Sequence, residues 1–383
     1  MGFVMHKNTN VTENIVLELY NPVTQLDSVK DIWTSLLNKC PHSYYLSWAW
    51  RELWIKSLPV DCNMILVAGF RNDLPVIAFF VGRKTATRHK FFKIRRLSLN
   101  STLIPYIDLL CIEYNAILID PNITISLDSI LDLLPIKWDE FHMPMCASIY
   151  QPNLLLNDDL SKSYNLSVTN LRSYYVDLDK VRRNNNDYLA LLSPKKRQQI
   201  RRSIREYEKM GEVRTTVAQN AEEALIILDE LIELHQREWT GRGCPGSFAN
   251  EYFSDFHKQL ISSRFNNNEI QLIRVSSGNY TIGCLYCFTY DGKALGYQCG
   301  FNFLPSNVYS PGMVCHYLAI EYYTMIGLSY YDFLEGDDSY KKSLSTDYNE
   351  MQNIVVRQRN MNYMIENTVV KIYNKFRGNI YSL

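Results

Sequence analysis

The stretch Asn307–Leu344, "NVYSPGMVCHYLAIEYYTMIGLSYYDFLEGDDSYKKSL", decides the fold of the region around it. It opens on Ser-Pro-Gly, in which the serine is a helix N-cap and the proline takes the first helical position. An apolar helix over about 312–326 and a strand over 329–334 are expected to follow. Because the helix joins strands on either side, the stretch predicts a crossover within a mixed α/β sheet.

The residues upstream complete this expected sheet. A helix starts at Ser193-Pro194 and stops at Gly211, and a second begins with Asn220 followed by Glu223, a pair typical of a capping box. Alternating apolar residues predict the strands 269–275, 281–290, 293–301 and, after the opening stretch, 351–358.

Two segments about 200 residues apart share one pattern. Met64–Gly82 and Ile270–Phe288 each place two β-branched or aromatic runs around a polar turn, which predicts a β-hairpin in each. A tryptophan-bearing helical stretch precedes each hairpin, and a strand, a helix and another strand follow. The chain is therefore expected to consist of two related α/β halves.

Length and charge fit this division. A chain of 383 residues exceeds the size at which one hydrophobic core stops growing. We expect an N-terminal domain over 1–160, a C-terminal domain over 161–360 and a helical tail over 361–383. The formal net charge is zero, so any binding of polyanions must come from a local basic patch.

The nine cysteines are scattered, and the one close pair, Cys284 and Cys287, lies in an apolar strand pattern. We therefore expect buried, reduced cysteines and no metal site. The N-terminus lacks the apolar core of a signal peptide, and no apolar run reaches membrane-spanning length. These features predict a cytoplasmic protein without an integral membrane segment.

The helix at Ser193–Lys209 carries seven cations against two anions. Arg197 and Arg201 are spaced to share one face. This face is either ordinary solvated surface or a site for a phosphate-bearing ligand, a tRNA or an anionic membrane.

Four further features have both a structural and a functional interpretation. The turn Ser306–Met313 is either a plain helix cap or a phosphate site at a helix N-terminus. Asp332, on an otherwise apolar strand, needs a partner or a raised pKa. The acidic residues that follow it are either a solvated loop or part of a catalytic edge. His235 is either a packed helix residue or a general base.

The C-terminal half resembles the GNAT-fold acyltransferases. The resemblance is carried by "SPKKRQQIRRSIREYEKMG", "LHQREWTGRGCPGSF" and the opening stretch, and more weakly by "SYYLSWAWRELW" (Ser43–Trp54). It points to the tandem-GNAT branch that contains the CelD/BioF-like acetyltransferases and the Fem-type peptidoglycan aminoacyl transferases. It implies two GNAT-like domains, each a mixed, mostly antiparallel sheet flanked by helices.

The resemblance also implies a site. In such folds a splayed pair of central strands holds the acyl donor, and the next helix start receives its pyrophosphate. The implied catalytic residues are Asp332, Glu335, Tyr340 and Lys341. The implied donor-binding residues are Gln298, Cys299, Gly300, Ser310, Gly312, Met313, Arg197 and Arg201.

The implied activity is direct transfer of an acetyl or other acyl group from acyl-CoA to an amine or hydroxyl of a small molecule or saccharide precursor. The sequence departs from single-domain GNAT enzymes in one respect: Ser-Pro-Gly stands where their Arg/Gln-x-x-Gly-x-Gly/Ala loop is found. A Fem-like transferase that uses aminoacyl-tRNA, and a GNAT pair that binds a ligand without catalysis, therefore stand as alternatives. The sequence indicates no oligomeric state.

Overall fold

The computed structural model describes residues 15–89, 91–156, 158–360, 363–366 and 368. The chain forms two compact units. Unit 1 comprises Met1–Asp108, Tyr114–Asn170 and Gln352–Leu383, and unit 2 comprises Leu109–Glu113 and Leu171–Met351. Most of the helical tail expected over 361–383 lies outside the described residues.

Unit 1 contains a mixed sheet with the strand order β1-β2-β3-β4-β7-β15. Its neighbouring strands are antiparallel except for the parallel pair β4 and β7. The strands of the sheet are β1 (Val16–Tyr20), β2 (Met64–Arg71), β3 (Leu74–Arg88), β4 (Phe92–Leu99), β7 (Glu140–Cys146) and β15 (Asp347–Gln358). The remaining elements of this half are α1 (Leu26–Leu37), α2 (Trp48–Lys56), β5 (Leu118–Ile119), β6 (Ile125–Ser126), α3 (Leu127–Leu133), β8 (Leu154–Leu155) and α4 (Asp158–Ser163).

The hairpin predicted over Met64–Gly82 is present as β2 and β3. Its turn residues Asn72 and Asp73 both have positive φ, 52° and 61°. Asn and Asp tolerate this left-handed backbone better than most residues, and such two-residue turns match the twist of paired strands. Local turn chemistry therefore sets this register.

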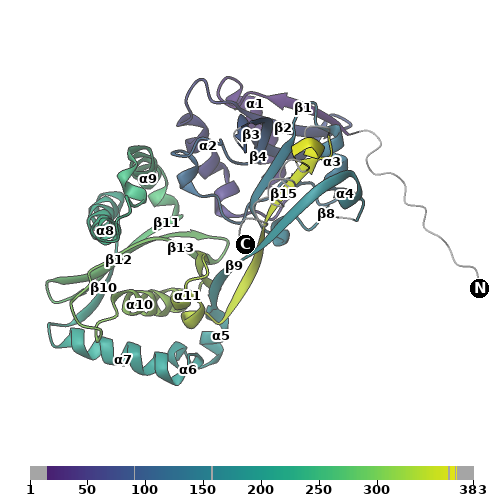
Figure 1. The fold of residues 1–383 in the computed structure, drawn as a ribbon. Helices are drawn as coiled ribbons and strands as arrows, with labels where there is room; N and C mark the ends of the chain where they lie inside the picture. The colour runs from purple at the N-terminus through teal and green to yellow at the C-terminus, as the bar shows by residue number, and fades with distance from the viewer. Residues whose placement is uncertain (1–14, 90, 157, 361–362, 367, 369–383) are drawn as a thin grey trace, which may run out of the picture. The chain divides into compact units, whose positions relative to one another are not determined.

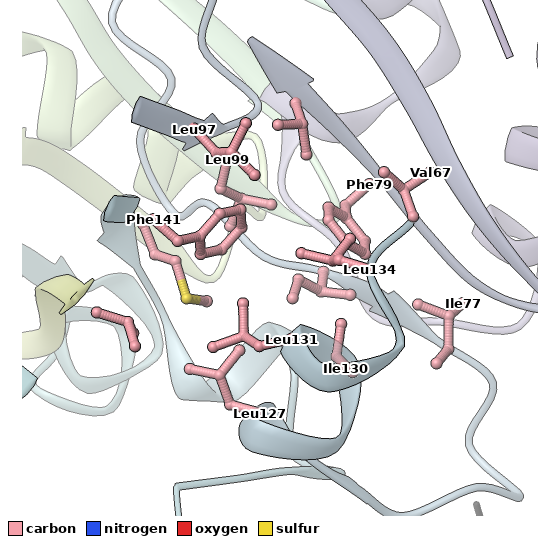
Figure 2. Packing of buried hydrophobic residues seen from close by; sticks show 14 of the residues in the cluster. Val67, Ile77, Phe79, Leu97, Leu99, Leu127, Ile130, Leu131, Leu134 and Phe141 are labelled. Atoms are coloured by element: carbon pink, nitrogen blue, oxygen red, sulfur yellow. The ribbon is translucent and has the colours of Figure 1, made fainter. Parts of the chain in front are cut away.

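One face of the unit 1 sheet packs against α3 (Figure 2). Phe79 and Leu97 from the strands meet Leu127, Ile130 and Leu131 from the helix, and all five side chains are buried. Burying such side chains contributes about 1.5–3 kcal/mol each relative to exposure.

Arg51 of α2 is fully buried in unit 1, beside the rings of Trp33, Trp54 and Phe80. Its three side-chain nitrogens have no hydrogen-bond partner among the described residues. Burial lowers the pKa of Arg51 to about 9. The three aromatic rings beside it offer the guanidinium cation–π contacts.

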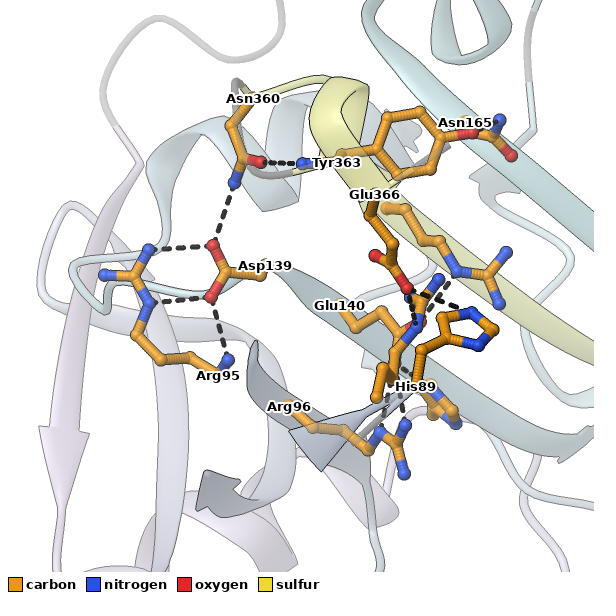
Figure 3. A network of polar contacts seen from close by, with 12 residues as sticks. His89, Arg95, Arg96, Asp139, Glu140, Asn165, Asn360, Tyr363 and Glu366 are labelled. Atoms are coloured by element: carbon orange, nitrogen blue, oxygen red, sulfur yellow. Dashed lines mark hydrogen bonds and ion pairs between the residues drawn. The ribbon is translucent and has the colours of Figure 1, made fainter. Parts of the chain in front are cut away.

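A buried ionic network joins β3, β4, β7 and β15 (Figure 3). Glu140 is 2% exposed and pairs with Arg88, Arg96 and Arg357 at 2.5–3.0 Å. Burial acts to raise the pKa of this carboxyl, but the hydrogen bonds from His142 and Arg357 and the charge of Arg88 together hold it well below its usual range. Glu140 is therefore ionised and fully paired, as a buried charge must be.

The strands of unit 2 follow the order β9-β14-β13-β12-β11-β10, with β9 belonging to this unit from Leu171 onward. The pair β13 and β14 is parallel and the other neighbours are antiparallel. The strands are β9 (Tyr164–Asp177), β10 (Val213–Val217), β11 (Ile270–Ser277), β12 (Tyr280–Tyr290), β13 (Lys293–Phe301) and β14 (Tyr330–Glu335). The helices are α5 (Leu178–Arg183), α6 (Tyr188–Leu191), α7 (Pro194–Glu208), α8 (Ala221–Gly241), α9 (Glu251–Arg264), α10 (Pro311–Met325) and α11 (Ser339–Leu344).

The helix starts of unit 2 follow the expected caps. The N–H of Lys196 donates to Ser193 Oγ at 3.4 Å, and the N–H of Glu223 donates to Asn220 Oδ1 at 2.9 Å. In Figure 1, α8 and α9 cover one face of the β10–β13 sheet, whereas α10 and α7 lie on the other.

The strand order along each sheet repeats: three antiparallel pairings precede one parallel pairing in both units. This confirms the prediction of two related α/β halves. Sequence patterns did not reveal β10, most of β9, or α11, which begins within the segment expected to be an acidic loop.

Within the described residues, no helix has the length and apolar character needed to cross a bilayer. The same part of the chain contains no group of three or more His, Cys, Asp or Glu side chains placed to hold a metal ion.

Candidate functional site

The parallel strands β13 and β14 separate after a short pairing. They pair only over Lys293–Leu295 and Tyr330–Asp332. From Gly296 onward β13 is hydrogen-bonded on its β12 side, and a register shift after Tyr286 places Tyr297 in a bulge. The outward N–H and C=O groups of β13 beyond Leu295 consequently have no strand partner on the β14 side.

A cavity of about 740 Å³ opens in unit 2 along this free edge. Its walls come from the exposed edge of β13, the start of α10, the end of α8 and the start of α11. The size is within the range usual for small-molecule and cofactor sites. Of the residues predicted from sequence, the cavity is lined by Gln298, Cys299, Ser310, Gly312, Met313 and Tyr340.

The start of α10 presents free backbone donors to the cavity. Ser310 N–H donates to Ser203 Oγ at 2.9 Å, and Pro311 has no N–H. The first intrahelical bond runs from Val314 to Ser310, so the N–H groups of Gly312 and Met313 have no partner among the described residues. Two free N–H groups at the positive end of a helix suit an anion such as a phosphate.

The end of α8 adds ionisable groups to the same cavity. His235, Glu238 and Arg242 all line it. Burial lowers the pKa of His235, and burial raises the pKa of Glu238 although Arg242 pairs with it. The sequence alone left open whether His235 is a packed helix residue or a general base, and it did not single out Glu238 or Arg242. Their i, i+3 and i+7 spacing, which places all three on one helix face, is the signal that identifies them.

Cys299 and Tyr340 line the cavity in their neutral forms. Burial, followed by the charge of Glu238, raises the pKa of the Cys299 thiol to about 12. Burial also raises the pKa of Tyr340, whose ring stacks on His316 at a centroid distance of 5.8 Å. At neutral pH, Tyr340 therefore keeps its proton and can donate it.

The other three predicted catalytic residues, Asp332, Glu335 and Lys341, do not line the cavity. Asp332 Oδ1 accepts the N–H of Leu334 at 2.8 Å and the hydroxyl of Ser173 at 2.7 Å. Lys341 Nζ donates to the carbonyl oxygens of Leu334, at 3.2 Å, and of Glu335. These contacts hold the end of β14, where Leu334 has a φ of 62°.

Glu113 joins this group and was missed from the sequence. It is 8% exposed, and its Oε2 accepts the backbone N–H of Glu335 at 2.7 Å. Burial raises the pKa of Glu113 to about 8, and nearby Asp332 adds to the rise, whereas the Glu335 N–H and Lys341 oppose it. No sequence pattern reveals it, because its partners lie more than 200 positions further along the chain.

The remaining predicted donor-binding residues lie outside the cavity lining. A side chain at Gly300 would stand closer than 3.0 Å to the backbone of Leu231 in α8, so this glycine permits close packing of helix on strand. Arg197 is half-buried and Arg201 exposed on α7, and neither forms an ion pair with a described residue. Gln199, between them, does line the cavity and donates to Ser310 Oγ at 3.2 Å.

The corresponding position in unit 1 is filled. The parallel pairing of β4 and β7 ends at Ser98 and His142. Beyond it, Asn115 Nδ2 donates to the carbonyls of Leu99, at 3.2 Å, and Pro144, at 3.0 Å. One amide thus bridges the two strands where unit 2 has its cavity.

Comparison with known proteins agrees with this geometry. Residues 194–342 match the family described as "Acetyltransferase (GNAT) domain". The matched segment, which extends from α7 to α11 in unit 2, is therefore similar to a GNAT domain.

Solved structures with a similar fold cover most of the chain. FemX has 11% identity and a TM-score of 0.49, covering 88% of this chain and 96% of its own. A tandem GNAT protein from the clavulanic acid biosynthesis pathway has 10% identity and a TM-score of 0.46, covering 89% and 98%. L-PGS from Bacillus licheniformis has 10% identity and a TM-score of 0.42, covering 89% and 95%. No curated protein matches the sequence. The identities are too low to transfer a substrate to this chain.

Proposed function

We propose that the protein transfers an acyl group from acyl-CoA to an amine or hydroxyl within the cavity of unit 2, by direct attack and without a covalent enzyme intermediate. The observation that carries this proposal is the free edge of β13 beside the open start of α10. It offers extended backbone for a pantetheine arm and two unpaired N–H groups for a pyrophosphate.

The residues fit the chemistry of thioester transfer. Charge develops on the carbonyl oxygen as the acceptor attacks, and the outward N–H groups of β13 near Cys299 can stabilise it. One such donor typically supplies about 2.7–4 kcal/mol of barrier lowering. Tyr340, protonated at neutral pH, would donate its proton to the departing sulfur.

Asp332, Glu335 and Lys341 support this site from outside the cavity. Their contacts hold the end of β14 and the start of α11, from which Tyr340 projects. We propose that they position Tyr340, and that neither carboxylate meets the acceptor.

A second donor is favoured by one observation. The cations of α7 have no ion pairs among the described residues, apart from Lys209 near its end. Uncompensated positive charge of this kind suits a polyanion, so an aminoacyl-tRNA is the alternative donor, as in Fem-like transferases.

Calorimetric titration with acetyl-CoA and with tRNA tests the proposal. We expect a micromolar Kd for acetyl-CoA that Cys299→Phe abolishes by filling the cavity, with the thermal unfolding temperature of that variant checked in parallel. Salt-sensitive tRNA binding without acetyl-CoA binding would favour the second donor. If the protein binds neither acetyl-CoA nor tRNA, the remaining alternative is a GNAT pair that binds a ligand without catalysis.

A further inference from the structure

The end of α8 carries a chain of three hydrogen-bonding groups that ends in the cavity. Gln236 Nε2 lies 2.8 Å from the carbonyl oxygen of Pro245. Because a carbonyl can only accept, this contact fixes the amide orientation of Gln236. Its other end, Oε1, lies 3.0 Å from Nδ1 of His235.

This orientation settles the tautomer of His235. Oε1 can only accept, so Nδ1 must carry the proton, and Nε2 of the neutral ring is left with a free lone pair. Nε2 has no hydrogen-bond partner among the described residues, and His235 lines the cavity. Burial lowers the pKa of His235, so the ring is neutral at pH 7.

Packing holds the ring in this orientation. His235 contacts Phe248 edge-on, with ring centroids 5.1 Å apart, and Trp239 at 5.8 Å. Gly246 lies against the same group, because a side chain there would stand closer than 3.0 Å to Gln236. A ring held on three sides with one free acceptor nitrogen has the geometry of a general base.

We propose that His235 is the general base that takes the proton from the acceptor, and that Gln236 is the positioning residue that keeps Nε2 unprotonated. The proposal rests on the proposed acyl transfer. The acceptor's N–H or O–H proton passes to His235 Nε2 while its electron pair forms a bond to the thioester carbon. The C–S bond breaks with its pair on sulfur, which receives the proton of Tyr340. The imidazolium then returns a proton to the tyrosinate through water in the cavity.

Two measurements test the geometry and the chemistry separately. Nitrogen-15 spectra of histidine in the full chain should assign to His235 a neutral ring protonated at Nδ1 at pH 7, and Gln236→Leu should remove that preference. A ring protonated at Nε2, or charged at pH 7, would overturn the inference whatever the donor is.

The kinetic test uses acetyl-CoA as the acyl donor and compares the rates of transfer to two acceptors, water and hydroxylamine. Water must lose a proton to attack, whereas hydroxylamine is already an uncharged, strong nucleophile near neutral pH. His235→Gln should bind acetyl-CoA within twofold of wild type and hydrolyse it at least a hundredfold more slowly, since general base catalysis contributes about 10²–10⁴. Its transfer to hydroxylamine should stay within about fivefold. His42→Gln, in unit 1, is the matched control.

Gln236→Glu distinguishes positioning from mere packing. A carboxylate still accepts from Nδ1 but stabilises the imidazolium, so the acid limb of the rate profile should move to higher pH. Glu238, Arg242, Asp338, Tyr297, Cys299 and Tyr340 line the same cavity and remain unchanged in this variant.

These experiments distinguish failure of the general-base proposal from failure of the proposed acyl transfer. Wild-type hydrolysis by His235→Gln with unchanged acetyl-CoA binding overturns the base and leaves the proposed function standing. If His235→Gln slows transfer to hydroxylamine as much as it slows hydrolysis, the role of His235 as general base is also overturned. The same holds if the wild-type protein binds acetyl-CoA but transfers the acetyl group to neither water nor hydroxylamine. Absence of acetyl-CoA binding overturns the proposed donor, and with it this reaction step.

Discussion

Asp332 and Lys341 both form hydrogen bonds with the backbone of Leu334. Asp332 Oδ1 accepts the N–H of Leu334 at 2.8 Å, and Lys341 Nζ donates to the carbonyl of Leu334 at 3.2 Å. Leu334 has a φ of 62°, a left-handed conformation that costs a leucine free energy. The pair therefore stabilises a strained turn at the end of β14.

This relationship predicts that Lys341→Met destabilises the fold. The change leaves the carbonyl oxygens of Leu334 and Glu335 without their charged donor, and a hydrogen bond to a charged group contributes about 1.5–3 kcal/mol. Urea unfolding of the variant measures the loss. Lys342→Met is the control, because Lys342 is the exposed neighbour on the same short helix. If Lys341→Met unfolds like wild type and loses only turnover, Lys341 acts in the reaction instead, as the family resemblance implies.

Glu113 predicts a pH dependence of stability. Its pKa is about 8 in the folded protein against a usual 4.5, so the folded state holds the proton over a range in which the unfolded chain has released it. The contribution to stability is full below about pH 4.5 and is lost as the pH rises toward 8. Glu113→Gln keeps an acceptor for Glu335 N–H and does not ionise.

The wild type should therefore lose stability relative to Glu113→Gln across this window, by a few kcal/mol at about 1.4 kcal/mol per pKa unit. Urea unfolding at intervals from pH 5 to 9 measures the difference between the two proteins. Parallel curves would mean that Glu113 is ionised in the fold throughout.

Gly246 offers a test of the Gln236 contact with a built-in control. Gly246 and Gly243 have nearly equal positive φ, 73° and 76°, so an alanine strains the backbone similarly at either position. A side chain at Gly246 would stand closer than 3.0 Å to Gln236 and 3.1 Å from His235 and Trp239, whereas one at Gly243 meets nothing within 4 Å. Gly246→Ala should reduce acetyl-CoA hydrolysis about tenfold more than Gly243→Ala does, at similar stability. Equal losses would show that the contact with Gln236 does not matter for turnover.

Much of the fold could be predicted because its signals are local. The cap at Ser193, the cap at Asn220 and the Asn72-Asp73 turn each depend on residues a few positions apart. The crossover helix after Ser-Pro-Gly and the splayed β13 followed from the same kind of pattern and from family resemblance.

The chemistry around β14 could not be predicted in the same way. The family resemblance implies that both Tyr340 and Lys341 are catalytic, whereas α11 places Tyr340 at the cavity and Lys341 at the Leu334 carbonyl. Side chains at neighbouring helix positions point in different directions, and a sequence motif alone does not show this. Glu113 depends on tertiary contact alone.

The charges of α7 give the last prediction. Arg197 and Arg201 flank Gln199, which lines the cavity, and neither arginine forms an ion pair with a residue that the structure describes. If they meet the phosphates of the donor, the double change Arg197→Ala/Arg201→Ala should weaken acetyl-CoA binding about tenfold or more, since hydrogen bonds to charged groups contribute about 1.5–3 kcal/mol. It should also flatten the salt dependence of binding, because fewer counterions are exchanged. Arg214→Ala removes an exposed arginine already paired with Glu212 and should change neither quantity. A double variant with wild-type affinity and salt dependence for both acetyl-CoA and tRNA would identify the face as solvated surface, and donor recognition would then depend on the start of α10 and on Arg242.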